Sequence, residues 1–169
     1  MKKILLYSIG CVVIVVCVVC YFAFTQTREL QECKNEQDKI SGCVQKKYYE
    51  NGNLEIETPF ENGKLHGVEK WYYENGNLEC EIPYQNGKLH GVEKEYDENG
   101  ILMSEIPYQN GKLHGVGKVY YENGNLQAQV TYENGSVLSG VCGDGKEIPN
   151  IQGLGYWDIG EQISKSCKE

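Results

Sequence analysis

Three histidines are the residues whose type and spacing most readily suggest chemistry. His66, His90 and His114 each lie in the same Leu-His-Gly step, and successive copies are 24 residues apart. Imidazole is a common metal ligand, but a shared ion needs each nitrogen at about 2.0–2.1 Å. If each repeated unit adds two β-strands, equivalent residues are about 9.6 Å apart. We therefore expect the three rings to pack near turns, and we expect no metal and no other cofactor.

Catalytic groups and a phosphate-binding loop are equally hard to place. The Asn-Gly-Lys steps at 62–64, 86–88 and 110–112 lack the glycine-rich run and the Lys-Ser/Thr pair of a phosphate loop. No lone Ser or Cys outside the repeated residues is paired with a base. Residues that are copied in register are more typical of a scaffold than of a nucleophile. The sequence predicts a protein that is not an enzyme.

The elements that must position these residues are set by a repeat of the dipeptide Asn-Gly. It occurs eight times, at intervals that alternate between 11 and 13 residues, so the period is 24 residues with two turns in each. Asn-Gly between short alternating runs favours type I′ hairpin turns, which need positive φ at both central residues. Eight turns predict about nine strands in an elongated, antiparallel, all-β hairpin array. The predicted turn glycines are Gly52, Gly63, Gly76, Gly87, Gly100, Gly111, Gly124 and Gly135.

The second strand of each unit alternates between apolar and acidic residues. Leu54 and Ile56 face one way while Glu55 and Glu57 face the other, which predicts one buried face and one solvated face. The alternation does not decide which face of the first strand, around Trp71, is the inner one. Two binding surfaces therefore stay open, an acidic strip and an aromatic surface. The strip comprises Glu55, Glu57, Glu79, Glu81, Glu93, Glu95 and Glu105, and the aromatic surface comprises Trp71, Tyr73 and Tyr121.

The N-terminal segment differs from the rest of the chain. Lys2 and Lys3 precede 21 uncharged residues, and such a run spans about 31 Å as a helix, enough to cross a bilayer. We expect residues 1–24 to form a transmembrane anchor with the N-terminus in the cytoplasm and the repeats exported to the periplasm or cell surface. A cleaved signal sequence, giving a secreted protein, and a lipoprotein signal are the alternatives. The remaining parts are a polar stalk (25–39), the repeat domain (40–142) and a C-terminal cap (143–169).

Charge and cysteine content narrow the partners and the compartment. The chain carries 24 acidic and 16 basic residues, a net charge of −8, which argues against nucleic acid and favours a cationic protein partner. An exported body permits disulfides. We predict the pairs Cys33 with Cys43 and Cys142 with Cys167, which bracket the two ends of the array. Cys80 lies at a buried repeat position and should be a free thiol.

The repeated motifs resemble a known family. Tyr-Tyr-Glu-Asn-Gly-Asn-Leu at 48–54, followed by Asn-Gly-Lys-Leu-His-Gly-Val at 62–68 and by further copies in phase, is similar to the bacterial variant of the MORN repeat. The resemblance covers residues 42–140 and implies a β-hairpin array that attaches to proteins or membranes without catalysis of its own. Bacterial chains of this kind are often grouped with antitoxins.

Two functions follow as hypotheses. The first is a non-catalytic, membrane-anchored repeat scaffold that binds a protein or envelope partner through its sheet. The second is an antitoxin or immunity protein that neutralises one cognate toxin, which a toxin-like reading frame beside the gene would favour.

Overall fold

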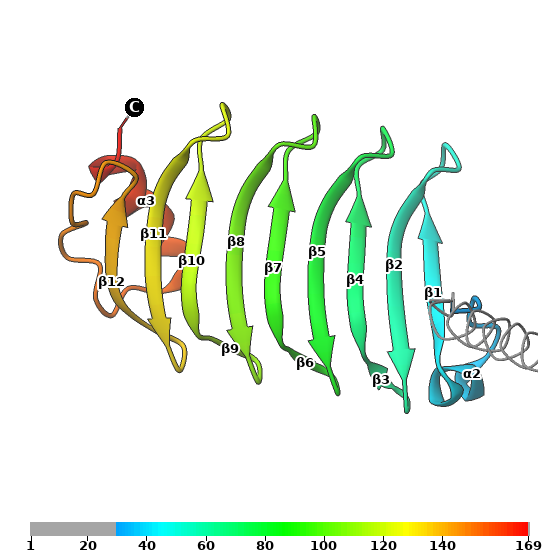
Figure 1. Cartoon of the computed structure of the whole chain (residues 1–169). Helices are drawn as coiled ribbons and strands as arrows, with labels where there is room; N and C mark the ends of the chain where they lie inside the picture. Colours follow the sequence, from blue (N-terminus) through cyan, green and yellow to red (C-terminus); the bar gives the residue numbers. More distant parts are fainter. Residues whose placement is uncertain (1–29, 169) are drawn as a thin grey trace, which may run out of the picture. The chain divides into compact units, whose positions relative to one another are not determined.

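The computed structural model describes residues 30–168, and its folded body is the unit that begins at Gln31. This body is one open antiparallel sheet, in which hairpins follow one another in chain order from β1 to β12 (Figure 1). The strands are β1 (Cys43–Tyr48), β2 (Leu54–Glu61), β3 (Lys64–Leu65), β4 (Gly67–Tyr72), β5 (Leu78–Gln85), β6 (Lys88–Leu89), β7 (Gly91–Tyr96), β8 (Leu102–Gln109), β9 (Lys112–Leu113), β10 (Gly115–Tyr120), β11 (Leu126–Glu133) and β12 (Ser136–Cys142), and the helices are α2 (Glu36–Ser41) and α3 (Tyr156–Ser166).

The sheet has 12 strands, whereas the sequence predicted about nine. Nine of them form the continuous path, and the other three, β3, β6 and β9, are two-residue strands that each precede a longer one. The interruption falls at the Leu-His-Gly step. His66 donates its backbone N–H to the carbonyl of Pro59 at 3.1 Å, and Gly67 has a φ of 111°. Each of the three Leu-His-Gly steps therefore kinks its strand, which explains why the motif recurs with the repeat.

The eight Asn-Gly turns are of two kinds, not the single kind that we predicted. At Asn62 and Gly63 both φ angles are positive, 52° and 69°, as a type I′ turn requires. At the turn before it only Gly52 is positive, at 88°, and its N–H donates to the carbonyl of Tyr49 at 3.0 Å. The pairing also shifts register beside this turn. These features define a type I turn followed by a glycine bulge, and the two kinds alternate along the chain.

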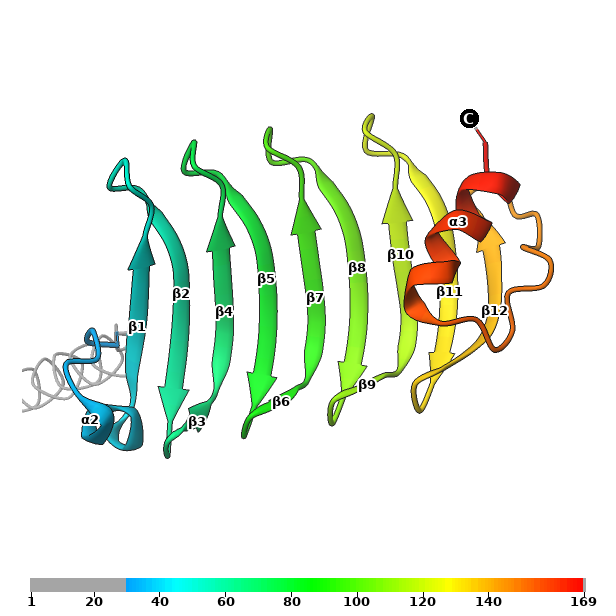
Figure 2. The same cartoon turned by 180° about the vertical axis from the view of Figure 1, so that it is seen from behind.

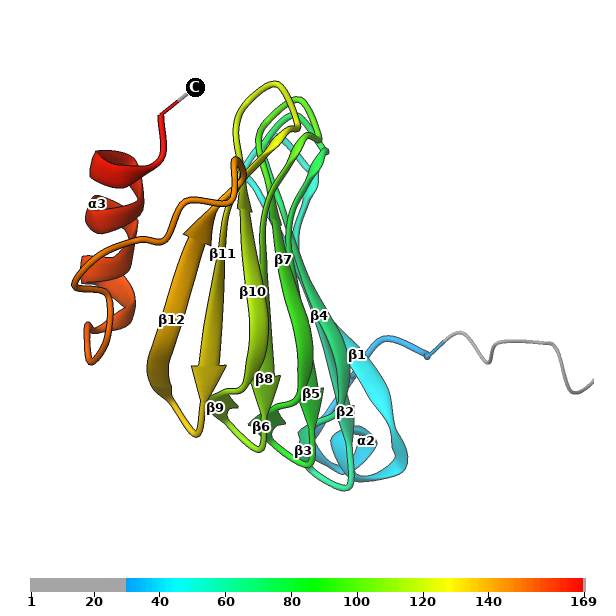
Figure 3. The same cartoon turned by 60° about the vertical axis from the view of Figure 1, so that its left-hand side comes forward.

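Two faces of the sheet can be defined from the strand pairings. The face that α3 covers is called the cap face; Figure 2 shows α3 in front of β11, and Figure 3 shows it to one side of the sheet. One row on this face runs through directly paired residues: Lys47, Ile56, Trp71, Cys80, Glu95, Ser104, Val119, Ala128 and Cys142. The opposite face is called the ladder face, and it carries Lys46, Lys70, Lys94 and Lys118.

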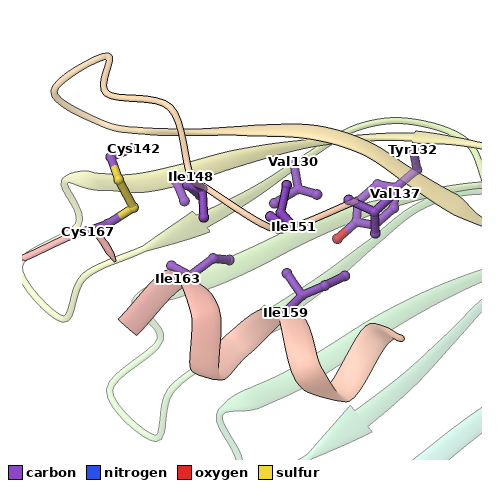
Figure 4. Packing of buried hydrophobic residues seen from close by; sticks show 10 residues of the cluster. Val130, Tyr132, Val137, Cys142, Ile148, Ile151, Ile159, Ile163 and Cys167 are labelled. Atoms are coloured by element: carbon purple, nitrogen blue, oxygen red, sulfur yellow. A yellow bond between two sulfur atoms is a disulfide. The ribbon is translucent and has the colours of Figure 1, made fainter. Parts of the chain in front are cut away.

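The best-packed core lies at the C-terminal end of the cap face. Ile159 and Ile163 of α3 pack with Val130 and Tyr132 of β11, and all four are at most 4% exposed (Figure 4). A disulfide between Cys142 and Cys167 ties the end of α3 to β12. The described part of the segment expected to form a C-terminal cap, residues 143–168 of 143–169, therefore covers the last unit of the sheet.

The N-terminal end of the sheet is closed by the residues expected to form a stalk. Within residues 25–39, the described part joins the sheet edge: Glu32 pairs with Val44, and Cys33 forms a disulfide with Cys43. Helix α2 begins with a capping box between Asn35 and Asp38, a signal that the sequence analysis did not use. From Leu30 on, the residues expected to form a stalk therefore cap the N-terminal edge of the sheet.

The expected membrane segment, residues 1–24, lies outside the described residues. From residue 30 to residue 168, no helix is both long enough and apolar enough to cross a bilayer.

Candidate functional site

The ladder face carries a row in which lysine and glutamate alternate from strand to strand. Lys46 stands opposite Glu57, and Glu57 in turn stands opposite Lys70 of the next unit. The Nζ atom of Lys46 lies 3.1 Å from Oε1 of Glu57. Opposite charges that face each other across strands stabilise a sheet, so this row is a structural ladder. In order it contains Lys46, Glu57, Lys70, Glu81, Lys94, Glu105 and Lys118.

Tyrosines of the following unit also contact the glutamates of this row. The hydroxyl of Tyr72 donates to Glu57 at 3.2 Å, and that of Tyr120 donates to Glu105 at 2.8 Å. Burial and the neighbouring carboxylate raise the pKa of Tyr72 to about 12, and the same two causes raise the pKa of Tyr120 to about 12. These hydroxyls stay protonated at neutral pH and join consecutive units.

The predicted acidic strip is therefore not one continuous surface. Glu57 and Glu81 belong to the ladder, where lysines balance their charge. Glu55 lies 2.5 Å from Nζ of Lys47. Glu95, which the prediction placed on the same strip, is paired with Cys80 on the cap face. The alternation within one strand could not show which residues of the neighbouring strands stand opposite.

The two faces differ in how faithfully the units copy one another. On the ladder face, the residues at positions 44, 68, 92 and 116 are all Val, those at 46, 70, 94 and 118 are all Lys, and those at 48, 72, 96 and 120 are all Tyr. On the cap face, the equivalent row reads Lys47, Trp71, Glu95 and Val119. The adjacent row reads Gln45, Glu69, Glu93 and Gly117. The units thus share a ladder face and differ in their cap faces.

The core beneath α3, which includes Tyr132 and against which Val119 packs, explains the cap-face residues of the fourth unit. A Cβ atom on Gly117 would lie 2.8 Å from Cε2 of Tyr132, so only glycine fits beside that ring. The second and third units have no such explanation. Glu69 and Glu93 are alike in these two units, but Trp71 of the second unit stands where the third has Glu95.

A hollow of about 520 Å³ lies on the cap face of the second and third units. Trp71 and Cys80 line it together with Glu93 and Glu95. Trp71 is 40% exposed, and its indole N–H donates to Glu69 at 2.9 Å. Tyr73 and Glu79 also line this hollow, so it brings together five of the predicted surface residues: Trp71, Tyr73, Glu79, Glu93 and Glu95.

A second hollow, of about 340 Å³, lies between the sheet and α3. Its lining is mainly apolar and includes Ile106, Val119 and Ile163. Glu95 borders both hollows, and its Oε2 accepts a hydrogen bond from Ser104 at 2.8 Å. The cap face therefore has an acidic and aromatic hollow next to an apolar one.

The acidic hollow has a negative charge that its own strands do not balance. Within β4, β5, β7 and β8, all of them described, both lysines stand on the ladder face. Burial, followed by the charge of Glu95, raises the pKa of Glu93, although a hydrogen bond from Tyr108 opposes this. Burial, aided by the surrounding glutamates, raises the pKa of the Cys80 thiol to about 12. The hollow thus favours a positive charge and keeps its thiol protonated.

The remaining predicted residues have structural surroundings. The hydroxyl of Tyr73 donates to the carbonyl of Tyr96 at 2.8 Å, and Tyr121 lies at a turn where its N–H donates to Asn125.

The imidazole Nδ1 atoms of His90 and His114 are buried without a hydrogen-bond partner. In the described part of the chain, no group of three His, Cys, Asp or Glu side chains is arranged to hold a metal ion. All eight predicted turn glycines have positive φ.

Sequence reasoning missed Glu69 and the apolar hollow beside α3. The signal for Glu69 was present in the sequence, because one repeat position carries three residue types, as Gln45, Glu69, Glu93 and Gly117. The apolar hollow depends on where α3 packs, which the repeat does not encode.

The fold and its repeated rows define a β-hairpin repeat protein. The model of the MORN repeat variant matches residues 44–62, 65–86, 89–110 and 113–134, together about half of the chain. The chain belongs to the MORN repeat variant family. A comparison with curated proteins finds no match.

Two solved structures are similar over part of the chain. One is the crystal structure of accessory secretory protein 1, 2 and 3 in Streptococcus pneumoniae, with a TM-score of 0.37 and 15% identity over 59% of this chain and 18% of that one. The other is the Glycosylation Associate Protein (Gap123) complex from Streptococcus agalactiae, with a TM-score of 0.40 and 18% identity over 72% of this chain and 23% of that one. The chain spans about a fifth of the length of either.

Proposed function

We propose that this protein is a non-catalytic, membrane-anchored repeat scaffold that binds a protein partner through its cap face. The observation that supports this is the contrast between the two faces. The ladder face repeats the same Val, Lys and Tyr in four units, while one cap-face position of the same strands carries four different residues, Lys47, Trp71, Glu95 and Val119. A position that only holds the array together can be copied, whereas a position that fits a partner must differ along the surface.

The composition of the uncovered cap face also supports binding. Trp71 is a large aromatic residue that remains 40% exposed beside a hollow. Exposed aromatic residues beside a pocket are typical of the central residues of protein interfaces.

A photocrosslinker placed on either face tests this proposal. The photoreactive amino acid p-benzoylphenylalanine is introduced in living cells at Trp71 on the cap face or at Val68 on the ladder face. These positions are matched, because they lie in the same strand and are 40% and 42% exposed. We expect a specific protein adduct from position 71 and none from position 68. Adducts from position 68 alone would refute the assignment of the face.

Anchoring and export rest on the N-terminal sequence, with Lys2 and Lys3 before the apolar run. Protease added to intact spheroplasts should digest the repeats and leave a short membrane-bound fragment. Full protection of the repeats would refute export, and release of the whole body into the medium before protease is added would indicate a cleaved signal. The antitoxin alternative gains no support from any feature of residues 30–168.

A further inference from the structure

The two hollows of the cap face together define what kind of segment can lie there. The first is lined by Trp71 and by the carboxylates of Glu79, Glu93 and Glu95. The second is lined by apolar side chains of the sheet and of α3. Since Glu95 borders both, a single ligand can enter the two hollows at once.

Charge selects a basic occupant for the first hollow. Lysines balance the glutamates of the ladder face. Glu69, Glu93 and Glu95 stand on the cap face, whereas the lysines of their strands, Lys70 and Lys94, stand on the ladder face. A Lys or Arg would meet these carboxylates and the ring of Trp71 together, which combines ion pairing with a cation–π contact. Phosphate groups of a nucleic acid or of an anionic membrane would be repelled from the same place.

Spacing then relates the two hollows. Equivalent positions in neighbouring units are about 9.6 Å apart, because each unit contributes two strands at about 4.8 Å. An extended chain in the polyproline II conformation advances about 3.1 Å per residue with about three residues per turn, so side chains three positions apart point the same way and lie about 9.3 Å apart. A segment that crosses the strands can therefore place one side chain in each hollow.

We propose that the cap face binds an extended basic segment of a partner protein, in which a Lys or Arg lies about three residues from an apolar side chain. The cation enters the hollow at Trp71, Glu93 and Glu95, and the apolar side chain enters the hollow between Ile106 and α3. This inference rests on the proposed function, since it takes the cap face to be the binding surface.

Selection from random dodecapeptides displayed on phage tests the chemistry of the occupant directly. The target is the full-length protein, immobilised in a non-ionic detergent. The recovered peptides are synthesised, and their affinities are measured by fluorescence polarisation for the parent and for E93Q/E95Q. The matched control is E50Q/E122Q, which removes two glutamate charges from exposed turns outside both hollows. Each variant is also melted, and E95Q alone replaces the double variant if the latter unfolds early.

We expect the recovered peptides to carry a Lys or Arg about three positions from a Leu, Ile, Val or Phe. Their affinity should fall by about tenfold or more in E93Q/E95Q and by less than about twofold in E50Q/E122Q. Replacing the cation of the peptide by Gln, or its apolar residue by Ser, should weaken binding to the parent.

Three results would overturn the inference. These are recovery of no peptide above background, peptides without Lys or Arg, and peptides that bind E93Q/E95Q as tightly as the parent. Peptides that lack Lys or Arg, or that bind E93Q/E95Q as tightly as the parent, contradict the inference. If they still lose affinity for Trp71→Ala, the proposed function stands. Peptides whose affinity changes neither in Trp71→Ala nor in E93Q/E95Q would refute both the inference and the proposed function.

Discussion

The hydroxyl of Tyr49 donates a hydrogen bond of 2.6 Å to the carbonyl oxygen of Tyr72, one unit further along the sheet. The same bond joins Tyr73 to Tyr96 in the next pair of units. Beside it, the amide of Asn53 donates to the carbonyl of Glu74 at 2.7 Å. Consecutive units are thus joined at their turns by side chains that reach backbone carbonyls.

This series of bonds is interrupted in the third unit, where Asp97 replaces the tyrosine and Ile101 replaces the asparagine. Asp97 instead accepts hydrogen bonds from its own turn, including one of 2.8 Å from the N–H of Ile101. We predict that Asp97→Tyr with Ile101→Asn restores the bonds to the fourth unit and stabilises the protein by about 1–3 kcal/mol. Thermal melting of the double variant and of Asp97→Tyr alone measures the gain. An unchanged melting temperature would show that the turns do not couple these units.

A type I′ turn in the middle of the array offers a test of backbone strain. Gly87 has a φ of 80°, and a Cβ atom there would have ordinary contacts, the nearest at 3.8 Å from Lys64. Gly87→Val should therefore cost about 1–3 kcal/mol through the backbone alone. Gly87→Asn is the control, since asparagine tolerates positive φ, and it should cost less. Denaturant unfolding measures both, and equal losses would contradict the explanation by φ.

Two glutamates should respond to pH with opposite signs. Burial and Glu95 raise the pKa of Glu93 above its ordinary value of 4.5, so charging Glu93 opposes folding as the pH rises through the region above 4.5. Hydrogen bonding by Tyr120 and the charge of Lys118 lower the pKa of Glu105, so its charge favours folding above pH 4.5 and this contribution is lost as the pH falls through the lowered pKa.

We therefore expect Glu93→Gln to be more stable than the parent at pH 7 and Glu105→Gln to be less stable. Both differences should shrink as the pH falls: that of Glu93→Gln shrinks in the region above pH 4.5 and is gone near 4.5, whereas that of Glu105→Gln shrinks only below about 4.5. Urea unfolding at pH 7, 5 and 4 provides the measurement. A difference of the same sign for the two variants would contradict the assigned environments.

The five cysteines in the described part of the chain should fall into two chemical classes. Cys80 is buried and its thiol pKa is raised to about 12, so alkylation of the folded protein at pH 8 should leave it unmodified until denaturant is added. Loss of the bond between Cys142 and Cys167, which are 25 residues apart, should cost roughly 3–4 kcal/mol. Loss of the bond between Cys33 and Cys43, 10 residues apart, should cost less. The stabilities of variants in which both cysteines of a pair are replaced by serine measure the cost of losing each disulfide. Peptide mapping without reductant shows whether Cys80 is alkylated in the folded protein.

The order of the nine strands along the sheet could be predicted from the sequence because an Asn-Gly pair marks each turn between them. It did not distinguish the two kinds of turn, since asparagine suits the central position of a type I turn as well as that of a type I′ turn. The two-residue strands were missed for a related reason: the kink at His66 and Gly67 depends on a hydrogen bond to Pro59 of the neighbouring strand.

The binding surface was only partly predictable, because a face is a property of several strands. Trp71 and Tyr73 were identified from residue type, but Glu81 was grouped with Glu79 although its neighbours are Lys70 and Lys94. The register between strands decides whether a lysine stands opposite a glutamate. The sequence of a single strand does not specify its register with the next strand. The hollow beside α3 required the packing of Ile159 and Ile163, which lie outside the repeat.

The N-terminal cap has a consequence for how such a protein can change in length. The N–H of Gly63 donates to the carbonyl of Lys39 in α2, whereas the equivalent N–H of Gly87 donates to Leu65 of the preceding unit. Helix α2 therefore substitutes for a missing unit, and it does so whatever the number of units that follow. An in-frame duplication of one interior unit would lengthen the protein without disturbing either end. Each duplicate would inherit an intact ladder face and a cap face free to diverge, so new recognition surfaces can arise by gene duplication within a single chain.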